Sequence, residues 1–143
     1  MKLLHICLVA RDAEALAAFY QTVFACKIKR DVKVIPAELV ERGTEVKNSD
    51  ATSIWLSFSD CNRPFLEVLQ FDTQHESKLT AVNTPGFGHL SFQVDDIGSA
   101  LESILANGGS QIGELTTLKA READIKIMFV RDPEGNVLEL EQV

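Results

Sequence analysis

The chain contains the same short pattern twice, and this repeat limits the possible fold more than any other feature. Residues 5–16 read HICLVARDAEAL and residues 89–101 read HLSFQVDDIGSAL. Both segments begin with His, alternate apolar and polar residues as a half-buried strand does, and reach an Asp seven positions later. Both then continue with helical spacing, and Asp12 and Asp96 stand where an N-cap residue would. We therefore predict a strand followed by a capped helix at the start of each half.

The two halves also end alike. Residues 66–71 read LEVLQF and residues 138–143 read LELEQV, so the pattern Leu-Glu-x-x-Gln-apolar closes each half. This pattern puts one glutamate, Glu67 or Glu139, at the same place in both halves. A match at both the beginning and the end indicates that the whole unit is repeated.

Further strand-like segments lie between these ends, with turn residues separating them. We predict additional strands near residues 28–35, 52–58, 111–113 and 125–131. We predict turns at residues 60–64 and 132–136, and a loop over residues 114–124 that forms a mobile rim. Each half is therefore a strand, a helix and three strands.

These elements define the predicted fold class. We expect an α+β fold built from two βαβββ modules. The modules cover about residues 1–74 and 85–143, and the polar segment between them is short. We therefore expect a single domain spanning residues 1–143.

Composition excludes several classes of function. Apolar residues make up 45% of the chain, but no run is long enough to cross a bilayer, and no signal-peptide pattern follows Lys2. Three cysteines without CxxC spacing are typical of reduced thiols, so we expect a cytoplasmic protein. The net charge of −7 and the lack of a Lys/Arg cluster argue against nucleic acid as a partner, and nothing predicts a membrane partner.

The repeated residues suggest a metal site. By strand alternation His5 and His89 lie on the polar faces of their strands, and Glu67 and Glu139 interrupt mainly apolar faces. A carboxylate in such a place needs a partner, because burying a lone charge is costly. If a pseudo-two-fold axis relates the halves, the four side chains converge. Two imidazoles and two carboxylates suit one divalent ion, such as Zn, Ni, Co, Mn or Fe(II).

A simpler interpretation is compatible with the same residues. A duplicated fold could retain these four residues as internal salt bridges without binding a metal. His75 has no counterpart in the other half, so we expect it at the surface. Trp55 is expected either beside the site or in the core.

The same segments resemble the vicinal oxygen chelate superfamily, which includes glyoxalase, bleomycin resistance and extradiol dioxygenase proteins. The resemblance rests on MKLLHICLVARD, PFLEVLQF, GFGHLSFQVDDI and FVRDPEGNVLELEQ, and it extends over nearly the whole chain. It implies an α+β fold in which two βαβββ modules form curled mixed sheets around a metal-binding cleft, with one metal ligand on the first and one on the last strand of each module. Those positions are His5, Glu67, His89 and Glu139, and the full His-Glu-His-Glu set is most similar to glyoxalase I-like proteins.

The resemblance also implies an activity. A glyoxalase I-like protein is a metal-dependent lyase or isomerase that acts on a small carbonyl compound or thiol adduct through an enediolate. It implies Glu139 as the leading catalytic base and Glu67 as its symmetric partner. Val9 and Phe71 stand where the glyoxalase I pattern has an Arg and an Asn that hold glutathione. Because neither side chain can bind a carboxylate or amide, the sequence favours a less polar substrate and no glutathione dependence.

Other functions within the superfamily are compatible with the same pattern. They are a metal-free protein that sequesters a ligand, as bleomycin resistance proteins do, an epimerase, and an Fe(II) dioxygenase. The superfamily also implies a homodimer. The four ligands could meet within one chain or between two.

Overall fold

A computed structural model describes residues 1–76, 78–119 and 123–143. The chain divides into two compact units, Met1–Glu76 and Ser77–Val143. Each unit has its own sheet and is described by itself. The prediction that residues 1–143 make one domain stays a prediction.

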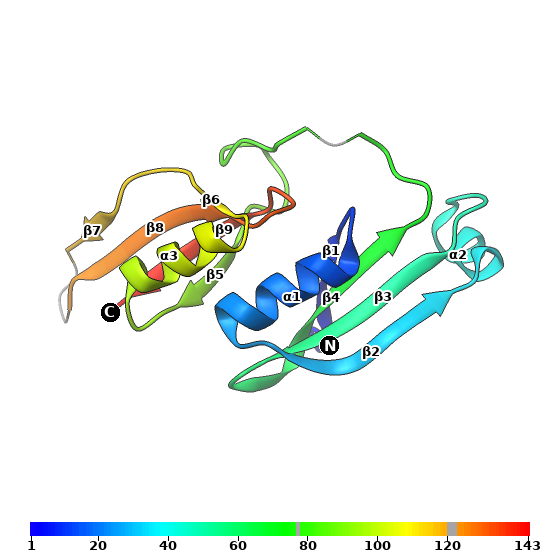
Figure 1. Cartoon of the computed structure of the whole chain (residues 1–143), viewed down its shortest axis with the longest axis horizontal. Helices are drawn as coiled ribbons and strands as arrows, with labels where there is room; N and C mark the ends of the chain where they lie inside the picture. Colours follow the sequence, from blue (N-terminus) through cyan, green and yellow to red (C-terminus); the bar gives the residue numbers. More distant parts are fainter. Residues whose placement is uncertain (77, 120–122) are drawn as a thin grey trace. The chain divides into compact units, whose positions relative to one another are not determined.

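The first unit is a four-stranded mixed sheet with one long helix on it (Figure 1). Its elements in chain order are β1 (His5–Val9), α1 (Ala13–Phe24), β2 (Lys27–Ile35), α2 (Ala37–Thr44), β3 (Ala51–Phe58) and β4 (Cys61–Phe71). The strand order is β1-β4-β3-β2, in which β1 runs parallel to β4 and the other pairs are antiparallel. Helix α1 packs against β3 and β4.

The second unit repeats this arrangement. Its elements are β5 (Leu90–Gln93), α3 (Ile97–Ala106), β6 (Ser110–Gln111), β7 (Thr116–Leu118), β8 (Ile125–Arg131) and β9 (Val137–Gln142). The strand order is β5-β9-β8-β6, β7 pairs with β8, and β5 runs parallel to β9. Helix α3 packs against β6, β8 and β9.

The repeated sequence pattern has a local explanation in both units. Asp12 accepts a hydrogen bond from the backbone N–H of Ala15 at 2.9 Å, and Asp96 accepts one from Ser99 at 2.7 Å, so both predicted N-caps are confirmed. Gly108, with φ of +86°, follows Asn107 at the end of α3, where a glycine adopts this conformation at little cost.

The structure also gives a role to the Leu, Glu and Gln of the pattern that closes each half. The leucine is fully buried in each unit, as Leu66 and Leu138 show. The glutamine is on the side of the helix: Gln70 accepts from the N–H of Ala13 at 2.8 Å, and Gln142 accepts from that of Ile97 at 3.2 Å. Since successive residues of a strand alternate between the faces, the intervening glutamate projects from the face opposite the helix.

The predicted fold class is confirmed: the described residues form an α+β structure with two mixed sheets. Three local predictions were wrong or incomplete. Helix α2 and strand β7 were not predicted, and the turn predicted at residues 60–64 is confined to Ser59 and Asp60, because β4 already begins at Cys61. Residues 120–122 of the predicted rim lie outside the described residues. Within the described ranges, no helix has the length and apolar character that a membrane span requires.

Candidate metal centre

The face of the first sheet that points away from α1 carries the predicted ligands of that unit. In the parallel pair of β1 and β4, His5 lies opposite Phe65 and Cys7 lies opposite Glu67. Paired residues in neighbouring strands point to the same side of a sheet, so His5, Cys7 and Glu67 share one face. We call this the open face of the first unit.

His5 and Glu67 are in direct contact. The His5 Nε2 atom lies 3.3 Å from Glu67 Oε2, and the Glu67 side chain is only 15% exposed. The His5 ring stacks on Phe65 with ring centroids 5.2 Å apart, which fixes the direction of the imidazole. The structure therefore brings together the two residues that the sequence selected in this unit.

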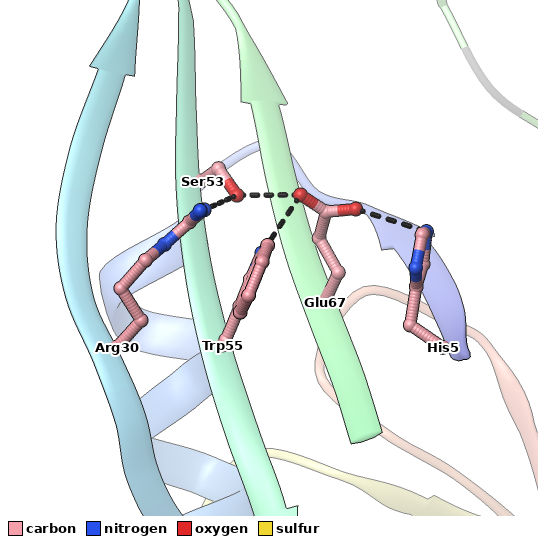
Figure 2. Close-up of polar contacts among 5 residues, drawn as sticks. All are labelled: His5, Arg30, Ser53, Trp55 and Glu67. Atoms are coloured by element: carbon pink, nitrogen blue, oxygen red, sulfur yellow. Dashed lines mark hydrogen bonds and ion pairs between the residues drawn. The ribbon is translucent and has the colours of Figure 1, made fainter. Parts of the chain in front are cut away.

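The second oxygen of Glu67 is held by two donors (Figure 2). Ser53 donates its hydroxyl proton to Glu67 Oε1 at 2.5 Å, and Trp55 donates its indole N–H to the same oxygen at 3.1 Å. Arg30 in turn donates to the Ser53 hydroxyl oxygen at 2.8 Å and lies over the Trp55 ring, 3.5 Å from its centroid. Glu67 is therefore the end point of a hydrogen-bonded chain that begins at a guanidinium group.

An irregularity in β2 places Arg30 in this chain. Ile28 pairs with Leu56, but Arg30 pairs with Trp55, so β2 contains one extra residue between these two pairs. Without the irregularity, Arg30 would point to the same side as Ile28 and Leu56, which is the buried side of β3. A bulge of this kind re-aims a side chain from one face of the sheet to the other.

The second unit contains the corresponding pair. His89 immediately precedes β5, and its Nε2 atom lies 3.7 Å from Glu139 Oε2, with the Glu139 side chain 14% exposed. The hydroxyl of Ser91 lies 3.1 Å from Glu139 Oε1 and 2.9 Å from Glu141 Oε1. The His89 ring meets Phe129 edge to face, with centroids 5.3 Å apart.

The thiol of Cys7 also lies on the open face. Partial desolvation of the thiol on the sheet raises the pKa of Cys7 to about 11, and the negative charge of Glu67 acts in the same direction. Cys7 is therefore a neutral thiol at pH 7. The side chain of Cys7 is exposed on the open face.

The donor atoms fit a divalent ion. Two donors about 2.1 Å from one ion are about 3.0 Å apart at a right angle and about 3.4 Å apart at a tetrahedral angle. The separation of 3.3 Å between His5 Nε2 and Glu67 Oε2 falls within this interval, and the 3.7 Å of the second pair is slightly wider. Within either unit, the described residues contain no group of three or more His, Cys, Asp or Glu side chains that could hold a metal. Each unit thus offers two donors.

Sequence reasoning missed Arg30 and Ser53, and it left the place of Trp55 open. Part of the signal was available, because Ile54 and Leu56 are buried and the alternation puts Ser53 and Trp55 on the opposite face. The partners of these two residues could not be derived, because they depend on the register between β3 and β4. Trp55 lies opposite Glu67 in that register.

Comparison with known proteins identifies the family. The model of the Glyoxalase/Bleomycin resistance protein/Dioxygenase superfamily matches residues 2–140. The chain belongs to this superfamily, so the family predicted from the sequence is confirmed.

The similar curated proteins are named as lactoylglutathione lyases. The chain is 29% identical over 143 residues to lactoylglutathione lyase from Arabidopsis thaliana and covers 99% of itself but 44% of that protein. It is 26% identical over 141 residues to a Vibrio parahaemolyticus protein named "Probable lactoylglutathione lyase", covering 99% of itself and 90% of that protein. The chain thus spans less than half the length of the plant relative.

Similar solved structures support the fold. A glyoxalase family protein from Bacillus cereus has a TM-score of 0.84 at 16% identity, with 99% of this chain and 93% of that chain covered. Glyoxalase I from Zea mays has a TM-score of 0.69 at 22% identity, covering 99% and 44%. The fosfomycin resistance protein FosX from Listeria monocytogenes, solved with Mn(II) and sulfate, has a TM-score of 0.59 at 17% identity, covering 99% and 91%.

Proposed function

We propose that this protein is a metal-dependent lyase or isomerase of the glyoxalase I type that acts on a small carbonyl compound or thiol adduct. The observation that carries the proposal is the recurrence of one His–Glu contact at matched places in the two units. We propose that His5, Glu67, His89 and Glu139 together bind one divalent ion, which would be Zn, Ni, Co, Mn or Fe(II). The names of the curated relatives agree with this class of reaction.

The chemistry follows from the kinds of residue at the site. When bound, the ion supplies Lewis-acid polarisation of two adjacent substrate oxygens. His5 and His89 would hold the ion as fixed ligands. Glu139 takes a proton from the carbon next to the substrate carbonyl and returns it to the neighbouring carbon, as a general base and then a general acid. Glu67 serves as its symmetric partner.

The side chains on the open face of the first unit favour a substrate that does not contain glutathione, which is a charged tripeptide. Val9 is 60% exposed on this face and lies opposite Leu69 in the register of β1 and β4. By strand alternation Phe71 follows Leu69 on the same face of β4. None of these side chains can pair with a carboxylate. Assay of the hemithioacetal of methylglyoxal and glutathione checks this part of the proposal, since efficient turnover would contradict it.

Elemental analysis of untagged protein tests the metal site. We expect about one divalent ion per site in the parent and loss of that ion in the His5→Ala and Glu139→Ala variants. Glu139→Gln tests the role of the base on a confirmed substrate: if full metal content and full turnover both survive, Glu139 is not the base. A parent that stays metal-free after incubation with Zn, Ni, Co, Mn and Fe(II) would instead place the protein among ligand-sequestering members of the superfamily.

The assembly and location of the protein also remain proposals. We propose that the chain acts in the cytoplasm as a homodimer with a small-molecule substrate. Light scattering on the purified protein, coupled to size-exclusion chromatography, measures the oligomeric state. A monomer that still binds one ion would show that the four ligands come from a single chain.

A further inference from the structure

The two carboxylates of the proposed metal centre have unequal surroundings. Glu67 Oε1 accepts from both Ser53 and Trp55, while its Oε2 faces His5. A carboxylate oxygen has two lone pairs, so these two donors occupy the hydrogen-bonding capacity of Oε1. Only Oε2 is then free to bind a metal ion. Glu67 is thus prepared as a ligand through one oxygen.

The direction of the hydrogen bonds around Ser53 is determined by Arg30. A guanidinium group has only donors, so the Ser53 oxygen must accept from it, and its single proton is left for Glu67. Ser53 has no exposed surface, which excludes competition from solvent at this hydroxyl. The positive charge of Arg30 also strengthens the donation, because hydrogen bonds in such a chain polarise one another.

Arg30 is held by its contact with Trp55 and by its hydrogen bond to Ser53. The guanidinium lies 3.5 Å from the centroid of the indole, and among the described residues its Nε is a buried nitrogen without a hydrogen-bond partner. An unsatisfied buried donor costs free energy. The bulge in β2 thus places Arg30 where its side-chain hydrogen bond goes to Ser53, the donor to Glu67.

The second unit offers Glu139 much less support. The positions that correspond to Ser53 and Trp55 by strand register are Ile127 and Phe129, which have no side-chain donor. Ser91 has one hydroxyl proton and lies within 3.1 Å of Glu139 and 2.9 Å of Glu141. A single proton can serve only one of the two carboxylates at a time.

We propose that Arg30, Ser53 and Trp55 are positioning residues that hold Glu67 as a fixed one-oxygen metal ligand, a support that Glu139 lacks. This inference rests on the proposed function. When an ion is bound, Glu67 would hold it through one oxygen in a fixed direction, whereas Glu139 would lack this support.

Cobalt(II) binding tests the inference without reference to turnover. The affinity of the full chain for Co(II) is measured by competition with a chromophoric chelator, and the visible absorption of bound Co(II) reports the coordination geometry. The variants are Ser53→Ala and Trp55→Phe. The matched control is Ser57→Ala, because Ser57 lies on the same strand and face but interacts with the Lys27 carbonyl instead of Glu67.

We expect Ser53→Ala to weaken Co(II) binding about tenfold or more, in the range seen for groups that orient metal ligands, and to change the absorption spectrum. Trp55→Phe should shift both quantities in the same direction, and it keeps the test decisive if Ser53→Ala does not fold. The control should match the parent.

Each contrary outcome has a distinct meaning. If the parent binds Co(II) and both variants bind it with parental affinity and spectrum, the positioning role is refuted while the proposed metal centre stands. If the parent binds neither Co(II) nor Zn(II), the proposed function fails, and the positioning role fails with it.

Discussion

Replacing Glu67 and Glu139 by glutamine, one at a time, should have different effects on metal binding. Glutamine has the shape of glutamate, but one of its two terminal atoms is an amide nitrogen that can only donate. At position 67, one orientation of the amide points this nitrogen at the donors Ser53 and Trp55, and the other points it at His5 and the metal. Neither orientation keeps both sets of contacts.

Glu139→Gln is less disruptive. The amide nitrogen can donate to the Ser91 oxygen, while the amide oxygen keeps the position of Oε2 beside His89. This variant loses the charge of one ligand but leaves no donor facing another donor.

The hydrogen bonds give the expected size of the difference. Two hydrogen bonds to the Glu67 carboxylate, each contributing about 1.5 kcal/mol at the low end of the range for charged groups, amount to about 3 kcal/mol. At about 1.4 kcal/mol for each factor of ten, Glu67→Gln should weaken metal binding about a hundredfold. We expect a loss of about tenfold for Glu139→Gln, which alters a ligand without opposing two donors.

Zn(II) affinity by chelator competition, followed by turnover at saturating metal, measures both effects. At saturating metal, Glu139→Gln should still lose about 10² to 10⁴ of the rate if Glu139 is the general base. Glu141→Gln is the matched control on the same strand, and its affinity should change by less than about fivefold, because interactions between partly exposed charges contribute at most about 1 kcal/mol. Equal losses at positions 67 and 139, or a larger loss at 139, would refute the reasoning.

Three further predictions concern stability and reactivity. Leu66→Ala removes a fully buried side chain and should lower the free energy of unfolding, measured in urea, by about 2–5 kcal/mol. Leu3→Ala, at a position 64% exposed, should change it by less than about 0.5 kcal/mol. Similar losses for the two variants would contradict the place of Leu66 in the core. The backbone N–H of Ser99 at the start of α3 lowers the pKa of Asp96, so the ionised Asp96 stabilises the fold at neutral pH and this stabilisation is lost as the pH falls below the ordinary value of 3.8. Asp96→Asn should therefore make acid unfolding, followed by circular dichroism, less steep. An unchanged unfolding profile would contradict the role of Asp96 as a cap. The pKa of Cys7 is raised from 9.0 to about 11. In metal-free Cys61→Ser protein, Cys7 should therefore react with a thiol reagent at pH 8 about a hundredfold more slowly than free cysteine does. Reaction at the rate of free cysteine would contradict the desolvation of this thiol.

Features that depend on residues close together in the sequence could be predicted from the sequence. The repeat indicated two similar units, and strand alternation alone put His5 on a polar face and Glu67 on an interrupted apolar one. The two N-caps were also predictable, because an Asp side chain at a helix start bonds an amide only three residues away.

Helix α2 shows why some elements could not be predicted in this way. It begins after Pro36 without a local side-chain cap, and the N–H of Ala37 is bound instead by the carboxylate of Asp50 at 2.7 Å. Only Val40 of this eight-residue helix is buried, and two turns are too short to establish a helical repeat in the sequence. The residue that satisfies its first amide lies thirteen positions further along the chain.

The surroundings of Glu67 also depend on residues that are distant in the sequence. Local pattern identified the glutamate, but its donors come from β3 and the guanidinium behind them comes from β2. Which side chains meet there depends on the register of three strands and on one extra residue in β2. A one-residue change of register turns every side chain of a strand to the other face, and that register is decided by contacts between distant segments. The candidate ligands could therefore be predicted from the sequence, whereas the side chains that contact Glu67 come together only when the sheet is assembled.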